Sequence, residues 1–466
     1  MIRLFRVFVP TSVVALLLSE VILIYSCYIT ATYLFLLTDV DAAVFLTEDG
    51  GFIRISLVVV VLVAGFYLND MYTRLRIRSR MMLLQQVCLV LGVAFLSQAL
   101  LSYADRDWIL PHWVMIYGSL FVLVLVPAWR ILFSSAVVAA MGAQNVLFLG
   151  SSPVLSRIAG HLTTHPELGQ IPIGYLDEAS DDEEDSMGEL PRLGGLEDVK
   201  AAVAEQKPDR IVVGMTERRN RLPVQQLLDL LFAGITVEEG AATYEATFGR
   251  VCARELRPSQ LIFTGALGPH QGSVALQSLY SPLIALVGAV IALPVMGVVA
   301  VLVKLSSPGS ILLRQRRVGL RGAEFTVFKF RSMYENAEAG TGAVWATRDD
   351  PRITPIGRWL RKLRLDELPQ LFNVIRGEMS LVGPRPERPE FVRILSEQIP
   401  YYRQRHSVKP GITGWAQINH KYGDTIEDTN IKLEYDLYYI KNLSPSLDVY
   451  IAFHTFKVMV LSRGAQ

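Results

Sequence analysis

The sequence predicts a chain of three parts: a membrane α-helical bundle at the N-terminus, an α/β Rossmann-like domain in the middle, and a mainly α (α+β) C-terminal domain with a re-entrant membrane helix. Its 466 residues exceed one ordinary core, which favours two or three domains. Apolar residues make up 51% and charged residues 19%, with a mean hydropathy of +0.33, which is typical of a chain that is partly solvated by lipid. Most charged residues follow position 140. We expect domain boundaries at 1–140, 141–268 and 275–466.

Residues 1–140 contain four stretches that are candidates to cross a bilayer, which takes about 20 apolar residues. The four stretches are 9–30, 55–68, 81–101 and 113–133. Arginines precede the first stretch, follow the second and lie near the end of the fourth, so these ends are expected in the cytoplasm. The three cysteines are scattered and indicate neither a disulfide framework nor a cysteine metal site.

Residues 145–237 contain short β-branched runs at 145–150, 173–176, 210–214 and 234–237 that alternate with amphipathic segments. This alternation predicts a small parallel α/β domain. The first run ends in the turn Gly150-Ser-Ser-Pro153, where dinucleotide-binding folds carry a glycine-rich phosphate loop, but only one glycine of that pattern is present. Nucleotide binding is therefore the less favoured hypothesis, and a role in packing, assembly or regulation is preferred.

A fifth apolar run covers residues 283–303 and contains Pro294, which removes a helical hydrogen bond. Lys304 and several arginines follow the run, so its C-terminal end is expected in the cytoplasm. Four preceding spans place its start there too. We therefore predict a re-entrant helix at about 280–304 that enters one leaflet, turns at Pro294 and returns. The alternative is a spanning helix that tolerates the proline and places the rest of the chain outside.

Two adjacent carboxylates, Asp366 and Glu367, lie in an arginine-rich segment. Arginine suits bidentate contacts with phosphate oxygens, so the segment indicates a phosphorylated substrate. Pro369 is expected in the first turn of a helix that Gly377 ends, which puts both acids at a helix N-terminus that favours anions. Without further context, Asp366 could simply cap that helix while Glu367 pairs with Arg364.

Five motifs favour a catalytic role for the acid pair over a helix cap: KFRSM (329–333), DPRIT (350–354), RKLRLDELPQ (361–370), GPRP (383–386) and KPGITGWAQIN (409–419). In this order, over about residues 280–466, they closely resemble the bacterial sugar transferases that act as polyprenyl-phosphate glycosyl-1-phosphate transferases. The layout of four spans, a Rossmann-like insert, a membrane-dipping helix and this domain is similar to the large members that start exopolysaccharide or O-antigen synthesis.

The resemblance implies roles for individual residues. Asp366 would be the nucleophile and Glu367 the ligand of Mg²⁺, and Pro294 would be the helix-breaking proline. Substrate-binding positions would be Lys329, Arg331, Arg361, Arg385 and Gln417. One departure is that family members usually open the re-entrant helix with a basic pair, whereas this chain has Leu279-Tyr-Ser-Pro-Leu283.

The implied activity transfers a sugar-1-phosphate from a UDP-sugar to undecaprenyl phosphate, by double displacement through an aspartyl-phosphosugar. The expected donor is UDP-glucose or UDP-galactose, with N-acetylated sugars as the alternative. The products would be undecaprenyl-diphosphate-sugar and UMP. The protein would be multi-pass in the bacterial inner membrane, with the catalytic domain on the cytoplasmic face, membrane lipid as a partner, a homodimer as one option and no nucleic-acid partner. The competing hypothesis is a non-catalytic assembly or regulatory protein that acts through the Rossmann-like domain, and the intact acid pair argues against it. Residues 447–461 are expected to form an interfacial helix.

Overall fold

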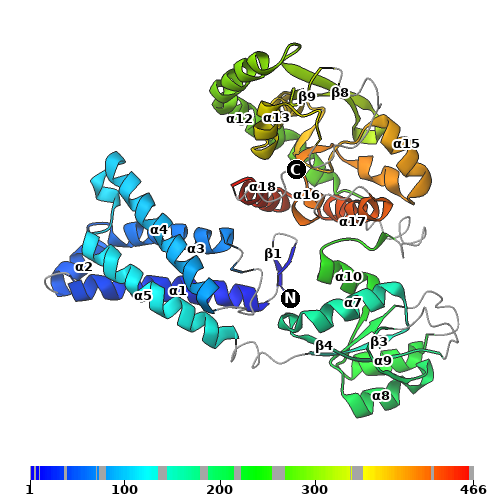
Figure 1. Ribbon diagram of the computed structural model, residues 1–466. Helices are drawn as coiled ribbons and strands as arrows, with labels where there is room; N and C mark the ends of the chain where they lie inside the picture. The colour runs from blue at the N-terminus through cyan, green and yellow to red at the C-terminus, as the bar shows by residue number, and fades with distance from the viewer. Residues whose placement is uncertain are drawn as a thin grey trace. The chain divides into compact units, whose positions relative to one another are not determined.

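The computed structural model describes residues 2–4, 7–9, 11–35, 39–69, 71–72, 80–134, 144–178, 187–214, 222–253, 268–335, 337, 350–420 and 425–460. By their contacts the residues divide into two units, one comprising residues 1–2 and 9–237 and the other residues 3–8 and 238–466. Figure 1 labels the helices and strands in chain order. A short pair of strands, β1 (Ile2–Leu4) and β2 (Val7–Val9), lies near the N-terminus.

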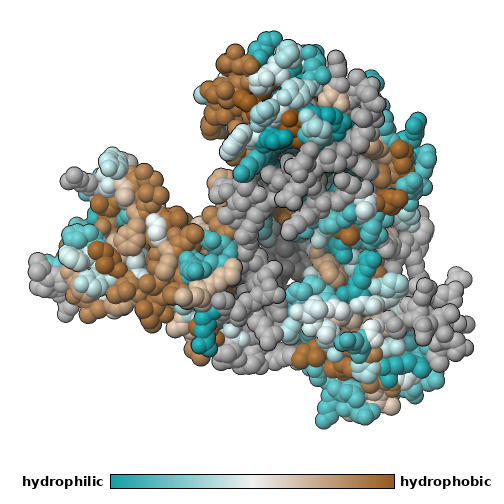
Figure 2. Space-filling model, viewed as in Figure 1, coloured by the Kyte–Doolittle hydropathy of each residue, from teal (hydrophilic) through white to brown (hydrophobic). Residues whose placement is uncertain are grey.

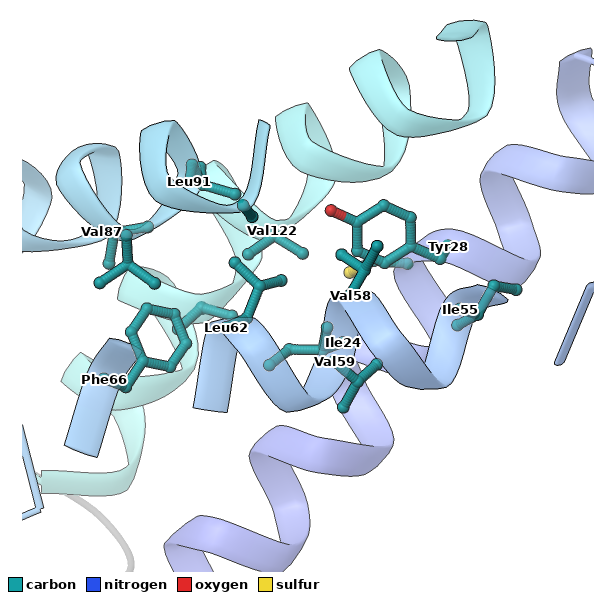
Figure 3. Packing of buried hydrophobic residues seen from close by; sticks show 14 of the residues in the cluster. Ile24, Tyr28, Ile55, Val58, Val59, Leu62, Phe66, Val87, Leu91 and Val122 are labelled. Atoms are coloured by element: carbon teal, nitrogen blue, oxygen red, sulfur yellow. The ribbon is translucent and has the colours of Figure 1, made fainter. Parts of the chain in front are cut away.

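The N-terminal helices form a bundle whose inner and outer surfaces are both apolar. Its members are α1 (Thr11–Phe35), α2 (Asp39–Thr47), α3 (Gly51–Leu68), α4 (Arg80–Ala104), the 3₁₀ turn Arg106–Trp108 and α5 (His112–Leu132). Residues such as Tyr28, Leu62 and Val122 meet in its core (Figure 3). All four predicted spans are confirmed as helices long and apolar enough to cross a membrane, namely α1, α3, α4 and α5.

A buried ion pair ties this bundle together. Arg130 of α5 places Nε at 2.5 Å from Oε1 of Glu20 on α1, and its Nη2 donates to Oε2 at 2.8 Å. The Tyr72 hydroxyl donates to the same carboxylate at 2.7 Å, and Arg130 Nη1 donates to the Met71 carbonyl. The pair therefore joins two helices to the segment after α3, and each charge has several partners, as burial requires.

The middle domain is built on a five-stranded sheet of order β5-β4-β3-β6-β7, in which β3 pairs in parallel with β4 and β6, and β4 pairs in parallel with β5. The strands are β3 (Gln144–Leu149), β4 (Gln170–Leu176), β5 (Arg192–Gly194), β6 (Arg210–Val213) and β7 (Thr236–Glu239). The helices are α7 (Pro153–Thr164), α8 (Val199–Gln206) and α9 (Val224–Phe232), with 3₁₀ turns at Pro166–Leu168 and Leu196–Asp198. The prediction of a parallel α/β domain is confirmed. In the turn after β3, Ser152 accepts from the Leu155 amide and caps α7, while Ser151 hydrogen-bonds Asp177.

The C-terminal unit combines two small sheets with helices. Its helices are α10 (Gly240–Phe248), α12 (Gln271–Ser306), α13 (Pro355–Lys362), α14 (Gln370–Ile375), α15 (Pro389–Gln398), α16 (Trp415–Asn419), α17 (Ile426–Asn442) and α18 (Pro445–Val460). Its 3₁₀ turns are Leu320–Gly322, Leu365–Glu367 and Tyr402–Ser407. The antiparallel hairpin joins β8 (Leu312–Val318) to β9 (Glu324–Phe330), and β10 (Ser380–Val382) pairs in parallel with β11 (Gly411–Thr413).

Helix α10 follows the last strand of the middle sheet and packs within the C-terminal unit. The Tyr244 hydroxyl donates to buried Glu434 of α17 at 3.0 Å, and Arg250 lies 3.4 Å from the same carboxylate. Lys441 pairs with Glu245 at 2.7 Å. The predicted 141–268 segment thus contains residues that are anchored on α17.

Helix α12 has 36 residues and stays helical through Pro294, so the predicted break of the helix at this proline is not present. One face carries the buried residues Gln277, Ser281, Ala285, Ala289, Met296, Val299 and Val303. Ala285 packs in one cluster with Val374 of α14, and Val299 packs in another with Leu360 of α13. The opposite face is also apolar, since Ile291 is 73% exposed and Leu305 79% exposed, and apolar residues gather there on the surface (Figure 2). This helix is therefore at once a wall of the domain core and an apolar outer surface.

Candidate active site

The two predicted catalytic acids lie on a tight turn between α13 and α14. Arg364 adopts a left-handed conformation (φ 54°) and starts the 3₁₀ turn that carries Asp366 and Glu367. Pro369 comes directly before α14, and Gly377 follows that helix with φ +76°. The predicted helix and its ends are confirmed. Both acids are only 8% exposed, so the turn presents them within the domain.

Lys329 reaches the acids because α14 is tied to the β8–β9 hairpin. The buried Asn373 accepts from the Phe328 amide at 3.1 Å and donates to the Thr326 carbonyl at 2.7 Å. These bonds fix the end of β9 beside α14. As a result, Lys329 Nζ donates to Glu367 Oε1 at 3.0 Å.

Arg385 reaches the acids because β10 and β11 approach closely. A Cβ added at Gly411 would lie 2.1 Å from the backbone nitrogen of Gly383, so only glycine fits there. The pairing brings the GPRP and KPGITGWAQIN motifs side by side. Arg385 Nη2 then donates to Glu367 Oε1 at 2.7 Å.

The backbone around Arg385 is held by two further arginines. Arg405 donates from Nη2 to the Arg385 carbonyl at 3.0 Å and pairs with the buried Asp436 at 2.8 Å. Arg317 donates to the Pro386 carbonyl at 3.0 Å. These side chains fix the position of Arg385 without contacting the acids themselves.

The two acids have opposite electrostatic environments. Burial would raise the pKa of Glu367, but Arg385 and Lys329 outweigh burial and hold that pKa well below its ordinary value. Burial, and then the charge of Glu367, raise the pKa of Asp366 to about 6, although Lys329, Arg361 and Arg385 oppose this. Asp366 accepts no hydrogen bond from the residues that the structure describes. A buried carboxylate with nearby cations but no fixed partner is poised to react.

The other predicted arginines have different surroundings. Arg361 of α13 donates to the Ser332 hydroxyl at 3.0 Å, and its charge acts on Asp366. Arg331 is buried and donates to the carbonyls of Ser307 and Pro308, directly after α12. Within the described residues Arg331 has no recorded contact with either acid, and its guanidinium instead holds the chain that leaves α12.

Gln417 lies in a pocket of about 180 Å³ next to the acids. The lining residues are Arg364, Glu367, Leu368, Leu371, Ile412, Thr413, Gln417, Ile418 and Thr455. Gln417 Nε2 donates to the Ile412 carbonyl at 3.4 Å, and its buried Oε1 has no donor among the described residues. The structure thus brings together Lys329, Arg361, Arg385, Gln417 and the acid pair.

Sequence reasoning missed several supporting residues. Asn373 could have been found, because it is a polar residue inside the short apolar run LFNVI. Such a residue, once buried, needs hydrogen-bond partners. Arg317 and Arg405 carry no comparable signal, since exposed arginines are frequent in this part of the sequence.

The acid pair also defines what could hold a metal ion. In the described part of the chain, no three His, Cys, Asp or Glu side chains gather as a metal site. Glu367 Oε1 is bound by Lys329 and Arg385, whereas the cation nearest to Oε2 among the described residues is Arg364, at 3.9 Å. The oxygens that suit a cation are therefore Oε2 and the Asp366 carboxylate. Two carboxylates together with substrate phosphates are a ligand set that Mg²⁺ accepts.

Comparison with known proteins covers both halves of the chain. Residues 273–462 match the family described as bacterial sugar transferase, and residues 67–231 match one described as a CoA-binding domain. A UDP-N-acetylgalactosamine-undecaprenyl-phosphate N-acetylgalactosaminephosphotransferase of Aeromonas hydrophila is 37% identical over 388 residues, 80% of this chain and 86% of that protein. A UDP-glucose:undecaprenyl-phosphate glucose-1-phosphate transferase of Xanthomonas campestris pv. campestris is 35% identical over 325 residues, 66% of this chain and 65% of that protein. An Escherichia coli (strain K12) protein with the latter name is 48% identical over 166 residues, 35% of each chain.

Proposed function

This chain belongs to the bacterial sugar transferase family, and on that premise we propose that it transfers a sugar-1-phosphate from a UDP-sugar to undecaprenyl phosphate. The products are undecaprenyl-diphosphate-sugar and UMP, in the first membrane step of exopolysaccharide or O-antigen synthesis. The names of the relatives specify UDP-N-acetylgalactosamine and UDP-glucose as donors. For this chain we propose a UDP-hexose, with UDP-glucose and UDP-galactose as the first candidates.

The observation that carries this proposal is the state of Asp366. It is buried, it accepts no hydrogen bond from the described residues, and its pKa is raised to about 6. Near neutral pH such a carboxylate is largely ionised and keeps a lone pair that no donor occupies. These are the properties of a nucleophile rather than of a helix cap.

We propose a double displacement at this residue. A carboxylate oxygen of Asp366 attacks the phosphorus that bears the sugar, and the bond from that phosphorus to the bridging oxygen breaks, so UMP leaves with the electron pair. The aspartyl-phosphosugar is then attacked at phosphorus by an oxygen of the lipid phosphate, which expels the Asp366 carboxylate. Lys329, Arg361 and Arg385 neutralise the phosphate oxygens, without which one anion would not approach another.

Mg²⁺ is part of the proposal, with Glu367 Oε2 as its protein ligand and substrate phosphates as the others. When bound, the ion would supply positive charge at the diphosphate oxygens. Lys329 and Arg385 hold the Glu367 carboxylate in one orientation, which keeps Oε2 directed away from the two cations on Oε1.

We also propose that α12 is re-entrant and that the active site lies at the cytoplasmic face of the inner membrane. A helix of 36 residues is about 54 Å long, whereas the hydrocarbon core is about 30 Å thick. If α12 crossed the bilayer, one half would be separated from the globular domain by lipid. Instead Ala285 and Val299, in its two halves, both pack against that domain. Cysteines placed at Gln271 and at Lys304 should both be labelled from the cytoplasmic side only.

The activity is tested with the purified full-length protein, labelled UDP-sugars, undecaprenyl phosphate and Mg²⁺. We expect labelled lipid with at least one UDP-hexose, and exchange of labelled UMP into the UDP-sugar without lipid, because the first half-reaction is reversible. Asp366→Asn keeps the shape of the side chain and should abolish both. Transfer of the sugar phosphate by the Asp366→Asn variant would refute the proposal. Light scattering of the purified protein tests the homodimer that we propose for the middle domain.

A further inference from the structure

We infer that the pocket beside Glu367 holds the isoprene unit that carries the phosphate of the acceptor lipid, an inference that rests on the proposed function. Two of the pocket's lining residues are charged, Glu367 of the acid pair and Arg364, and they form its polar end. From there its walls are formed by Leu368 and Leu371 of α14 and by Ile412 of β11. The pocket is therefore largely apolar and has charged residues of the acid-pair turn at one end.

Most polar groups of the remaining wall bond one another, and among the described residues the buried Oε1 of Gln417 is the exception. The hydroxyls of Thr413 and Thr455 hydrogen-bond at 2.7 Å, and Gln417 donates to the Ile412 carbonyl. A nucleobase in this space could donate to Gln417 Oε1, but it would bury its other carbonyl and N–H groups against leucine and isoleucine, and unpaired polar groups are costly. A hydrocarbon group has no such groups to satisfy, so the chemistry of the walls favours the lipid over the nucleotide.

The size of the pocket suits a single isoprene unit. A closed apolar cavity of about 150 Å³ takes up benzene. The pocket here measures about 180 Å³, which fits a branched five-carbon group but not a sugar nucleotide. The phosphate attached to this unit would then lie at the polar end, next to Arg364 and the acids.

The helix that bears Thr455 also has an apolar outer face. Thr455 lines the pocket from α18, and the same helix exposes Val449, Phe453 and Phe456 on its outer side. Their spacing of three and four residues places them on one face of the helix. A face of this kind suits the membrane interface, where the following isoprene units lie.

The first experiment fills the pocket and measures the two half-reactions separately in the full-length protein. Thr455→Phe should leave UMP exchange into the UDP-sugar within twofold of the wild type, because the donor does not enter the pocket. Transfer to undecaprenyl phosphate should fall at least tenfold. The matched control is Thr164→Phe on α7, since Thr164 bonds the carbonyl four residues earlier, as Thr455 does, but lies exposed in another domain.

The outcomes separate the inference from the proposed function. Exchange and transfer that fall together, or a higher KM for the UDP-sugar, would assign the pocket to the donor and overturn the inference, as would unchanged transfer. Absence of exchange in the wild-type protein would refute the proposed function instead.

A second measurement does not depend on the folding of a variant. With the wild-type protein, isoprenyl phosphate should accept the sugar phosphate at least about tenfold better than methyl phosphate, because its hydrocarbon group leaves water for the pocket. Equal kcat/KM for the two acceptors would contradict the inference.

Discussion

Replacing Arg405 with methionine should destabilise the C-terminal unit and slow catalysis, and the two effects can be separated. Arg405 and Asp436 are 7% and 2% exposed and lie 2.8 Å apart. Removing one partner of a buried ion pair leaves the other charge uncompensated, which costs about 3–5 kcal/mol. In a domain of 150–250 residues each kcal/mol shifts the melting temperature by about 2–4 °C, so a fall of roughly 6–20 °C is expected.

The catalytic effect has a different cause. Arg405 also donates to the Arg385 carbonyl, and Arg385 binds Glu367. Without that bond the GPRP loop can shift, and a displacement of about 1 Å in an active site can lower the rate by about 100-fold. UMP exchange measured below the melting temperature of the variant reports this loss.

The double variant Arg405→Met/Asp436→Leu distinguishes the two effects. Apolar residues of similar size often replace a buried ion pair without loss of stability, so the melting temperature should recover. UMP exchange should stay low, because the hydrogen bond from Arg405 to the Arg385 carbonyl is still missing. Full recovery of exchange in the double variant would refute the positioning role of Arg405.

Three further predictions concern other parts of the molecule. Lys329 lowers the pKa of Asp366, which must be ionised to attack. Lys329→Met should therefore raise that pKa above about 6 and shift the acidic limb of the pH–rate profile of UMP exchange to higher pH. An acidic limb at the same pH as in the wild type would contradict this. Gly411→Ala should force β10 and β11 apart at a cost of about 1–3 kcal/mol, seen as a lower melting temperature together with reduced exchange. Glu20→Gln leaves the buried charge of Arg130 without its counter-ion and should lower the melting temperature of the detergent-solubilised protein. The double variant Glu20→Leu/Arg130→Met should recover part of that loss. Equal melting temperatures of the wild type and both variants would argue against a stabilising role of the ion pair.

The sequence predicted the elements of the fold better than their contacts. Helices α1, α3, α4 and α5 follow from long, largely apolar runs, and the α/β domain follows from short β-branched strands, because both patterns are local. The turn with Asp366 and Glu367 was predictable for the same reason, since Pro369 and Gly377 mark the ends of a helix.

The assembly of the site was not predictable, because it depends on pairs that are distant in the sequence. Lys329 meets Glu367 only through the bonds of Asn373 to β9, and Arg385 meets it only through the pairing of β10 with β11. Arg331 lies in the same motif as Lys329, yet it binds carbonyls at the end of α12. A motif identifies residues but does not show which atoms each side chain will reach.

Helix α12 is both part of the core of the C-terminal unit and an apolar outer surface, and this limits how the domain can be made water-soluble. Its inner face supplies Ala285, Met296, Val299 and Val303 to two hydrophobic clusters of the C-terminal unit. Trimming this helix to release a water-soluble enzyme would open both clusters to solvent. Polar substitutions on its outer face would leave both clusters in place but would remove the apolar surface that we propose to contact lipid. The two faces of one helix therefore have separate tasks: the inner face is required for the domain to fold, whereas the outer face can be changed without removing a core residue.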